Sequence, residues 1–253
     1  MECVELDIPV PHVAVVMLNR PPVNALNQQA RHELIAVMDE LQSRDDVRCL
    51  VLTGKGRIFC AGADIKEKAD LNQGDHSQAA ANRLTRDVFL SVLDSSKPVI
   101  GAINGHALGA GMVLASCCDF LLAADTAKFA MPEIDVGQGG GASYLQRVLP
   151  LTLMRRMMLT GMRVPATELY RRGVIEECLS ADELVGSAVE VAAAIAAKSP
   201  LAVRTIRESF VSVEHLPMAE AFKIEQRYTS MLSASPDADE ARRAFFEKRR
   251  PVF

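Results

Sequence analysis

The chain has 253 residues, of which 49% are hydrophobic and 24% charged, and its formal net charge is −4. This composition is typical of a globular protein, and the acidic balance argues against a dedicated nucleic-acid-binding protein, which would normally be basic. The longest apolar runs, such as residues 13–18 and 192–197, are far shorter than the roughly 18 residues of a membrane-spanning helix. The N-terminus shows no leader pattern and the cysteines show no disulfide spacing. We therefore expect a reduced, cytoplasmic protein without nucleic-acid or membrane partners.

Strands and helices alternate in the first part of the chain. Short apolar runs rich in β-branched residues indicate buried strands over residues 12–18, 48–53, 99–103 and 119–124. Asn27 can cap a helix whose apolar positions fall on one face. These positions are Ala30, Leu34, Val37, Met38 and Leu41. The alternation predicts crossover connections and a mainly parallel sheet, so we expect an α/β fold.

After Pro150 the pattern becomes helical. Apolar periodicity predicts helices over residues 151–159, 181–198, 201–212, 218–232 and 237–246, whereas only residues 174–178 resemble a strand. Proline disfavours the helical conformation in the residue before it, so Ser199-Pro200 marks a soft boundary. We expect a core over residues 1–198 and a helical region over residues 199–253.

Two loops of small residues follow predicted strands. One spans residues 59–65, and the other spans residues 104–111 and leads into a helical stretch. Small residues let a ligand approach main-chain N–H groups, and two convergent N–H donors would form an oxyanion hole. The alternative explanation is that these residues serve close packing or tight turns.

At these loops the sequence resembles the enoyl-CoA hydratase/isomerase (crotonase) superfamily, and the resemblance runs almost end to end. It begins with Asn24-Ala25-Leu26 and continues through four longer motifs in family order. These are FCAGADIKE (59–67), KPVIGAINGHALGAG (97–111), AKFAMPEIDVG (127–137) and AFFEKRRPVF (244–253).

The resemblance implies a spiral of β-β-α turns with a helical C-terminal region that trimerises, often into a dimer of trimers. It also implies an acyl-CoA thioester substrate, with CoA entering as part of the substrate and no metal or redox cofactor. By position, the N–H groups of Ala63 and Ala110 would bind the thioester oxygen as an enolate develops. Fixed donors of this kind stabilise the transition state more than the ground state.

Further positions match the family's CoA contacts. Those in the first half of the chain are Arg20, Pro22, Ala61, Asp64, Ile65 and Lys66. Phe245 and Lys248 match positions that the family's C-terminal helix lends to a neighbouring subunit. The alternative for Lys248 and the arginines after it is a solvated basic tail.

The sequence departs from the family's hydratases at one glutamate. Hydratases use two glutamates, because adding water needs a base for the water and a proton source at the α carbon. The second matches Glu133, but the first falls on Val113, which cannot bind or orient a water. Other family activities place a second carboxylate beyond Glu133, at a position that is Gly141 here. Asp135 would share a face with Glu133 in an extended strand and could assist it, or it could serve a turn or an ion pair.

One carboxylate facing an enolate-stabilising site matches the family's enoyl-CoA isomerases. We therefore expect double-bond isomerisation, with Glu133 as the single acid/base. Enoyl-CoA hydration is the main alternative, followed by a decarboxylase or hydrolase of the same fold. A catalytically silent relative that binds CoA or RNA is also consistent with the missing glutamate, although the retained Glu133 and both loops argue against it.

Overall fold

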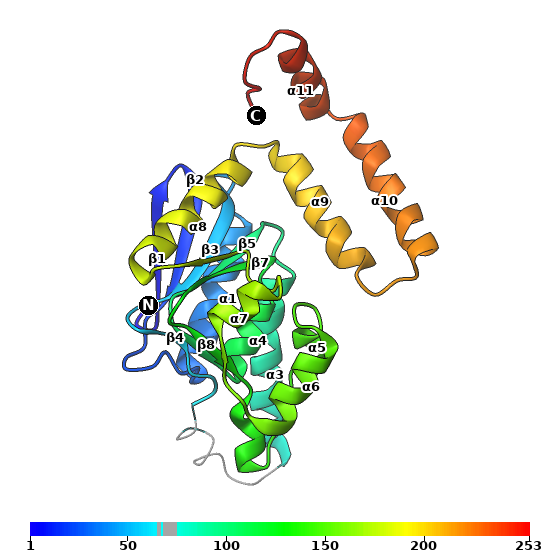
Figure 1. Cartoon of the computed structure of the whole chain (residues 1–253). Helices are drawn as coiled ribbons and strands as arrows, with labels where there is room; N and C mark the ends of the chain where they lie inside the picture. The colour runs from blue at the N-terminus through cyan, green and yellow to red at the C-terminus, as the bar shows by residue number, and fades with distance from the viewer. Residues whose placement is uncertain (65–66, 68–74) are drawn as a thin grey trace.

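The computed structural model describes residues 1–64, 67 and 75–253, and within them two sheets form the centre of the molecule (Figure 1). The larger sheet has six strands in the order β1-β2-β3-β5-β7-β10. They are β1 (Val4–Val10), β2 (His12–Leu18), β3 (Val47–Gly54), β5 (Val99–Ile103), β7 (Phe120–Ala124) and β10 (Glu177–Leu179). The smaller sheet has four strands in the order β4-β6-β8-β9. They are β4 (Ile58–Cys60), β6 (His106–Leu108), β8 (Lys128–Ala130) and β9 (Val164–Pro165).

The chain visits both sheets in each turn of a spiral. β3 in the large sheet is followed by β4 in the small one, β5 by β6, and β7 by β8. β1 and β2 pair antiparallel, whereas β2, β3, β5, β7 and β10 pair parallel in sequence. The α/β class, the four early strands and the mainly parallel pairing are therefore confirmed. The β-β-α spiral that the resemblance implies is also present.

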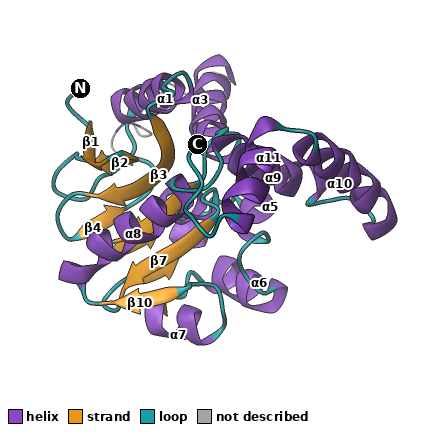
Figure 2. Ribbon diagram, turned by 90° about the horizontal axis from the view of Figure 1, so that it is seen from above, coloured by secondary structure: helices purple, strands orange, loops and turns teal. Residues whose placement is uncertain are grey.

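Helices cover both sides of the large sheet. On one side lies α8 (Ala181–Ala196), which packs along β2, β3, β5 and β7 (Figure 2). On the other side α1 (Gln28–Gln42) packs against α3 (Asp75–Leu93). Asn27 caps α1 as predicted, since its side chain accepts from Ala30 N over 2.9 Å. The five predicted apolar positions of α1 are all buried.

Short helices fill the segment between the small sheet and α8. They are α4 (Ala110–Ser116), the 3-10 helix η1 (Pro132–Val136), α5 (Ala142–Leu145), α6 (Leu151–Thr160) and α7 (Ala166–Arg171). The strand predicted over residues 174–178 is shifted. Gly173 has φ +71° and Val174 N donates back to Leu169 O, so the chain turns after α7 and pairs with β7 only from Glu177.

The last three helices form an arm that projects from the body of the molecule (Figure 1). This C-terminal arm consists of α9 (Pro200–Val213), α10 (Met218–Ser233) and α11 (Pro236–Phe246). Ser199 caps α9 by accepting from Ala202 N over 2.9 Å. The predicted helices of residues 151–246 are all present, whereas the division into units of 1–198 and 199–253 stays a prediction. Within the described residues, no single helix passes a length and hydropathy test for a membrane span; α8 and α9 pass it only together, across a bend of 107°.

Candidate functional site

The two loops of small residues lie against each other. A Cβ at Gly62 would come within 2.8 Å of Leu108 O and 3.3 Å of Ala110 N. At Gly111, a Cβ would lie 2.8 Å from the Cβ of Cys60. Such approaches are closer than ordinary van der Waals contact, so only glycine allows the loops to meet here. The close packing that was the alternative for these loops is therefore real, and it also brings residues 60–64 next to residues 108–111.

The N–H groups of Ala63 and Ala110 lie where the two loops meet. Ala63 forms a parallel bridge with Leu26, in which Leu26 N donates to Gly62 O and Asp64 N donates to Leu26 O. The N–H of Ala63 therefore points away from Leu26. Ala110 is the first residue of α4, and a first-turn N–H has no acceptor within its helix. Within the part of the chain that the structure describes, neither N–H donates a hydrogen bond.

Glu133 reaches this meeting point from η1. A Cβ at Gly109 would lie 3.0 Å from the side-chain Cδ of Glu133 and closer still to its Oε1. Gly109 has φ +55° and immediately precedes Ala110. The carboxylate that the resemblance singles out thus lies against the residue that precedes Ala110 in the chain.

The wall beside Glu133 is apolar. Val113 is 3% exposed, and its Cγ2 would lie 2.5 Å from a Cβ at Gly141. The methyl group of Met131 comes within 3.6 Å of the same point. The two positions at which relatives with other activities are expected to carry a second carboxylate are therefore in contact. Here a valine side chain fills the space between them.

Asp135 does not face the same way as Glu133. Residues 132–136 form a 3-10 helix rather than an extended strand. With three residues per turn, positions two apart point in different directions. The carboxylate of Asp135 lies against Gly161, where a Cβ would be 3.0 Å from Oδ2. The idea that Asp135 shares a face with Glu133 is wrong.

The residues proposed to contact CoA in the loop after β2 and in the segment after β4 lie close to one another. Arg20 forms an ion pair with Asp64 over 2.7 Å and donates to Ala25 O over 3.1 Å. Ala61 N donates to Val23 O over 3.0 Å, next to the exposed Pro22. The structure therefore places Arg20, Pro22, Ala61 and Asp64 on adjoining segments, although the guanidinium of Arg20 is already held by the protein.

Asn24 joins these segments. It is 4% exposed, and its Nδ2 donates to Lys55 O and Ile58 O over 3.0 and 2.8 Å. Its Oδ1 accepts from Arg20 N over 2.9 Å. One buried amide thus satisfies three main-chain groups and fixes the first loop on the segment that leads into β4.

Of the four other candidate positions, Ile65 and Lys66 lie outside the described residues, and Phe245 and Lys248 do not reach the site within one chain. Phe245 is in α11 and Lys248 follows it, and Figure 1 shows this end of the arm well away from the loops. Phe245 is 79% exposed. Contact with CoA would therefore need a second copy of the chain, as the resemblance implies.

The cysteine in the loop over residues 59–65 is not poised as a nucleophile. Cys60 is fully buried, and burial raises the pKa of its thiol to about 12. A thiol with such a pKa stays protonated at neutral pH. Among the described residues, no group of three or more His, Cys, Asp or Glu side chains is arranged to hold a metal ion.

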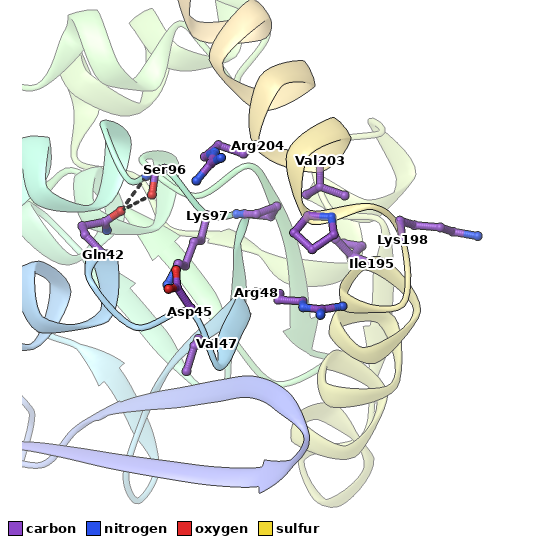
Figure 3. Close-up of a pocket in the computed structure, with 12 residues that line it drawn as sticks. Gln42, Asp45, Val47, Arg48, Ser96, Lys97, Ile195, Lys198, Val203 and Arg204 are labelled. Atoms are coloured by element: carbon purple, nitrogen blue, oxygen red, sulfur yellow. Dashed lines mark hydrogen bonds between the residues drawn. The ribbon is translucent and has the colours of Figure 1, made fainter. Parts of the chain in front are cut away.

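A separate cavity lies at the opposite edge of the sheet, where β3 and β5 begin (Figure 3). Main-chain oxygens accept from two of its four basic side chains, Lys97 and Arg48. Lys97 Nζ donates to Leu41 O over 2.5 Å and to Arg44 O, and Arg48 donates to Ala196 O and Phe253 O over 3.3 and 3.0 Å. Figure 3 shows Lys198 extending away from the other side chains. Lys97 and Arg48 thus donate to carbonyl oxygens near the ends of α1 and α8, and this cavity is distinct from the site at Glu133.

Sequence reasoning missed the role of three residues at the site. Gly109 seats the carboxylate of Glu133, Gly141 makes room for Val113, and Asn24 ties the first loop. Asn24 and Gly109 fall within the motifs that carry the resemblance. Their contacts depend on segments far away in the sequence, so no local pattern could indicate them.

Comparisons with known proteins agree with this architecture. The model of the family described as "Enoyl-CoA hydratase/isomerase" matches residues 11–253. The chain is 36% identical over 248 residues to a probable enoyl-CoA hydratase of Mycobacterium tuberculosis, covering 95% of this chain and 94% of that protein. It is 35% identical over 247 residues to a carnitinyl-CoA dehydratase of Proteus mirabilis, covering 94% of each. A crystal structure of an enoyl-CoA hydratase from Bacillus anthracis superimposes with a TM-score of 0.94 at 31% identity, over 99% of this chain and 98% of the other. The chain therefore belongs to the enoyl-CoA hydratase/isomerase family, the crotonase superfamily.

Proposed function

We propose that this protein is an acyl-CoA enzyme that moves the double bond of an enoyl-CoA from the β-γ to the α-β position, with Glu133 as its single acid/base. The observation that supports this most strongly is the wall beside Glu133. Val113 and Gly141 touch at the two positions where relatives are expected to place a second carboxylate. Val113 can neither donate nor accept a hydrogen bond. The chemistry therefore has to proceed with one carboxylate.

Isomerisation needs no more than this carboxylate and two N–H donors. The carboxylate of Glu133 takes a proton from the α carbon, and the electron pair shifts through the thioester carbonyl to give a dienolate. The N–H groups of Ala63 and Ala110 hold the negative oxygen. The same proton then returns from Glu133 to the γ carbon, so the double bond moves and no atom is gained or lost. No metal or redox cofactor is required.

Hydration is the second candidate, because several relatives are named enoyl-CoA hydratases. It would need a second group to position and deprotonate water opposite Glu133. Hydration is therefore expected to be slow relative to isomerisation.

A matched pair of substrates separates the two reactions. The protein is incubated with a 3-enoyl-CoA and, separately, with the corresponding 2-enoyl-CoA in heavy-oxygen water, and the products are followed by mass spectrometry. We expect the 3-enoyl-CoA to give the 2-enoyl isomer without a change in mass. Rapid incorporation of heavy oxygen from the water into the product of the 2-enoyl-CoA, without isomerisation of the 3-enoyl-CoA, would instead establish hydration.

We further propose that CoA binds across the loop between β2 and α1 and the segment after β4. Arg20, Pro22, Ala61, Asp64, Ile65 and Lys66 would contact it in the same subunit. Binding does not depend on turnover, so acetyl-CoA should release heat in calorimetry and raise the melting temperature. The absence of both effects at saturating ligand would contradict the substrate class.

The arm is proposed to assemble the protein into a homotrimer or a dimer of trimers. Large apolar side chains on the arm are exposed, among them Phe210 at 60%, Phe222 at 58% and Phe246 at 80%. Exposed apolar surface of this kind marks association sites. In the assembly, Phe245 and Lys248 would reach the CoA site of a neighbour. Sedimentation at micromolar concentration should give a trimer or hexamer, and a stable monomer would contradict the assignment.

A further inference from the structure

An arginine in the turn after α5 connects α4 to the C-terminal arm. The side chain of Arg147 is 14% exposed, and its Nη1 donates to the main-chain oxygen of Ser116 over 2.9 Å. Ser116 is the last residue of α4. The final carbonyls of a helix have no partner inside it, so Arg147 supplies a missing donor. A positive charge at this end also complements the helix dipole.

Glu214 holds Arg147 from the arm. It is the residue that ends α9, and its two carboxylate oxygens accept from Arg147 Nε over 2.7 and 3.0 Å. The side chain of Glu214 is 28% exposed. Since neither partner is fully solvated, the pair is screened less than an ordinary surface ion pair. The orientation of the Arg147 guanidinium is thus set by a residue of the arm.

The helix that Arg147 caps begins with Ala110. α4 has seven residues, Ala110–Ser116, and so rises only about 10 Å from one end to the other. A helix this short is stabilised little by its own hydrogen bonds, so its placement depends on tertiary contacts, namely the packing of its buried residues 111–116 and the contacts at its two ends. Gly111 abuts Cys60 at the first end, and Arg147 donates to Ser116 at the second.

We infer that Arg147 is a positioning residue for α4, and that Glu214 makes this positioning depend on the C-terminal arm. The contacts stand on their own, whereas their effect on rate rests on the proposed function of Ala110. A displacement of the arm would move Glu214 and with it Arg147, which holds the carbonyl of Ser116. The displacement of α4 that follows would change the position of the Ala110 N–H. Because the arm is also the proposed assembly surface, association of subunits and the geometry of the thioester site become linked.

Hydrogen exchange tests the structural half of this inference without any turnover. The variants are Arg147→Met and Glu214→Gln. The control is Glu168→Gln, which removes a carboxylate that binds Arg171 and Arg172 over 2.7 Å on the surface of α7. We expect the amides of α4 to exchange about tenfold faster or more in both variants, as for the loss of a charged hydrogen bond. The control should leave α4 unchanged. Wild-type exchange of α4 in Arg147→Met would overturn the inference.

Kinetics test the functional half. A displacement of about 1 Å at a reacting group costs up to about a hundredfold in rate. We therefore expect kcat on a 3-enoyl-CoA to fall tenfold to a hundredfold in Arg147→Met, with the Kd for acetyl-CoA nearly unchanged and partial recovery in Arg147→Lys. An unchanged kcat in folded Arg147→Met, despite faster exchange of α4, would overturn the link to catalysis. If the wild-type protein itself fails to isomerise, the proposed function fails while the exchange result still decides the role of Arg147.

Discussion

The carboxylate of Glu133 lies directly over the α-carbon of Gly109, the residue before Ala110. A Cβ at position 109 would come within 3.0 Å of the Glu133 Cδ. Gly109 also adopts φ +55°, which residues with a side chain rarely do. The glycine therefore determines where the proposed acid/base group stands relative to the start of α4.

Gly109→Ala should displace that carboxylate. We expect isomerisation to slow by about a hundredfold or more, because the reacting groups no longer align. Gly140→Ala is the matched control, since a Cβ at Gly140 would meet nothing within 4 Å. Steady-state rates on a 3-enoyl-CoA, with circular dichroism to confirm folding, make the comparison. Equal rates in the two variants would mean that the seat of Glu133 does not matter.

Val113→Glu tests whether the missing second carboxylate is what prevents hydration. The new carboxylate would lie against Met131 and the backbone of Gly141, where desolvation raises its pKa. Hydration of a 2-enoyl-CoA should therefore appear only as the pH rises through this raised pKa, when the carboxylate can act as a base. A pH series of heavy-oxygen incorporation measures it. If the wild type hydrates a 2-enoyl-CoA as fast as Val113→Glu does, Val113 does not limit hydration.

Asn24→Asp should destabilise the first loop. The change replaces an amide donor that faces two carbonyl oxygens, those of Lys55 and Ile58, with an acceptor. We expect a loss of about 1–3 kcal/mol in the free energy of unfolding, the usual cost of leaving a buried polar group unpaired. Asn27→Asp is the control, because the side chain of Asn27 accepts a hydrogen bond at its helix cap and an aspartate can accept it equally well. Urea titrations of both variants should differ clearly.

Arg207 anchors the arm through a buried ion pair. It is 4% exposed, pairs with Asp119 over 2.9 Å and donates to Leu93 O over 3.0 Å at the end of α3. Arg207→Met should lower the free energy of unfolding by about 3–5 kcal/mol, because Leu93 O loses a donor and Asp119 loses its cationic partner while keeping the hydrogen bond from Val99 N. Arg171→Met breaks an exposed pair and should change the urea midpoint little. A midpoint equally unaffected by Arg207→Met would show that α9 docks without this pair.

Four strands of the large sheet, β2, β3, β5 and β7, were predictable because they are apolar runs with few polar interruptions, whereas β1, which carries Glu5 and Asp7, was not predicted. The small sheet was not, since β4, β6 and β8 have three residues each and β9 has two. Such strands are too short for a hydrophobic period to be recognised. Their pairing partners also lie far apart in the sequence.

At the site, the resemblance of motifs singled out residues some of which lie on adjoining segments, with Glu133 against Gly109 and Arg20 paired with Asp64. It did not reveal the 3-10 helix, which turns Asp135 away from Glu133. The contact of Arg147 with Glu214 joins residues 67 positions apart. Neither feature leaves a local signal in the sequence.

The central claim is that Glu133 alone carries the proton, and Glu133→Gln tests it most directly. The amide keeps the shape of the side chain and removes the base. The rate of isomerisation of a 3-enoyl-CoA is measured for the variant and the wild type, with the Kd for acetyl-CoA measured in parallel. The account predicts a rate lower by about a hundredfold to ten-thousandfold, the usual contribution of a general acid–base, at a nearly unchanged Kd. Equal rates in the variant and the wild type would mean that another group moves the proton and would contradict the mechanism.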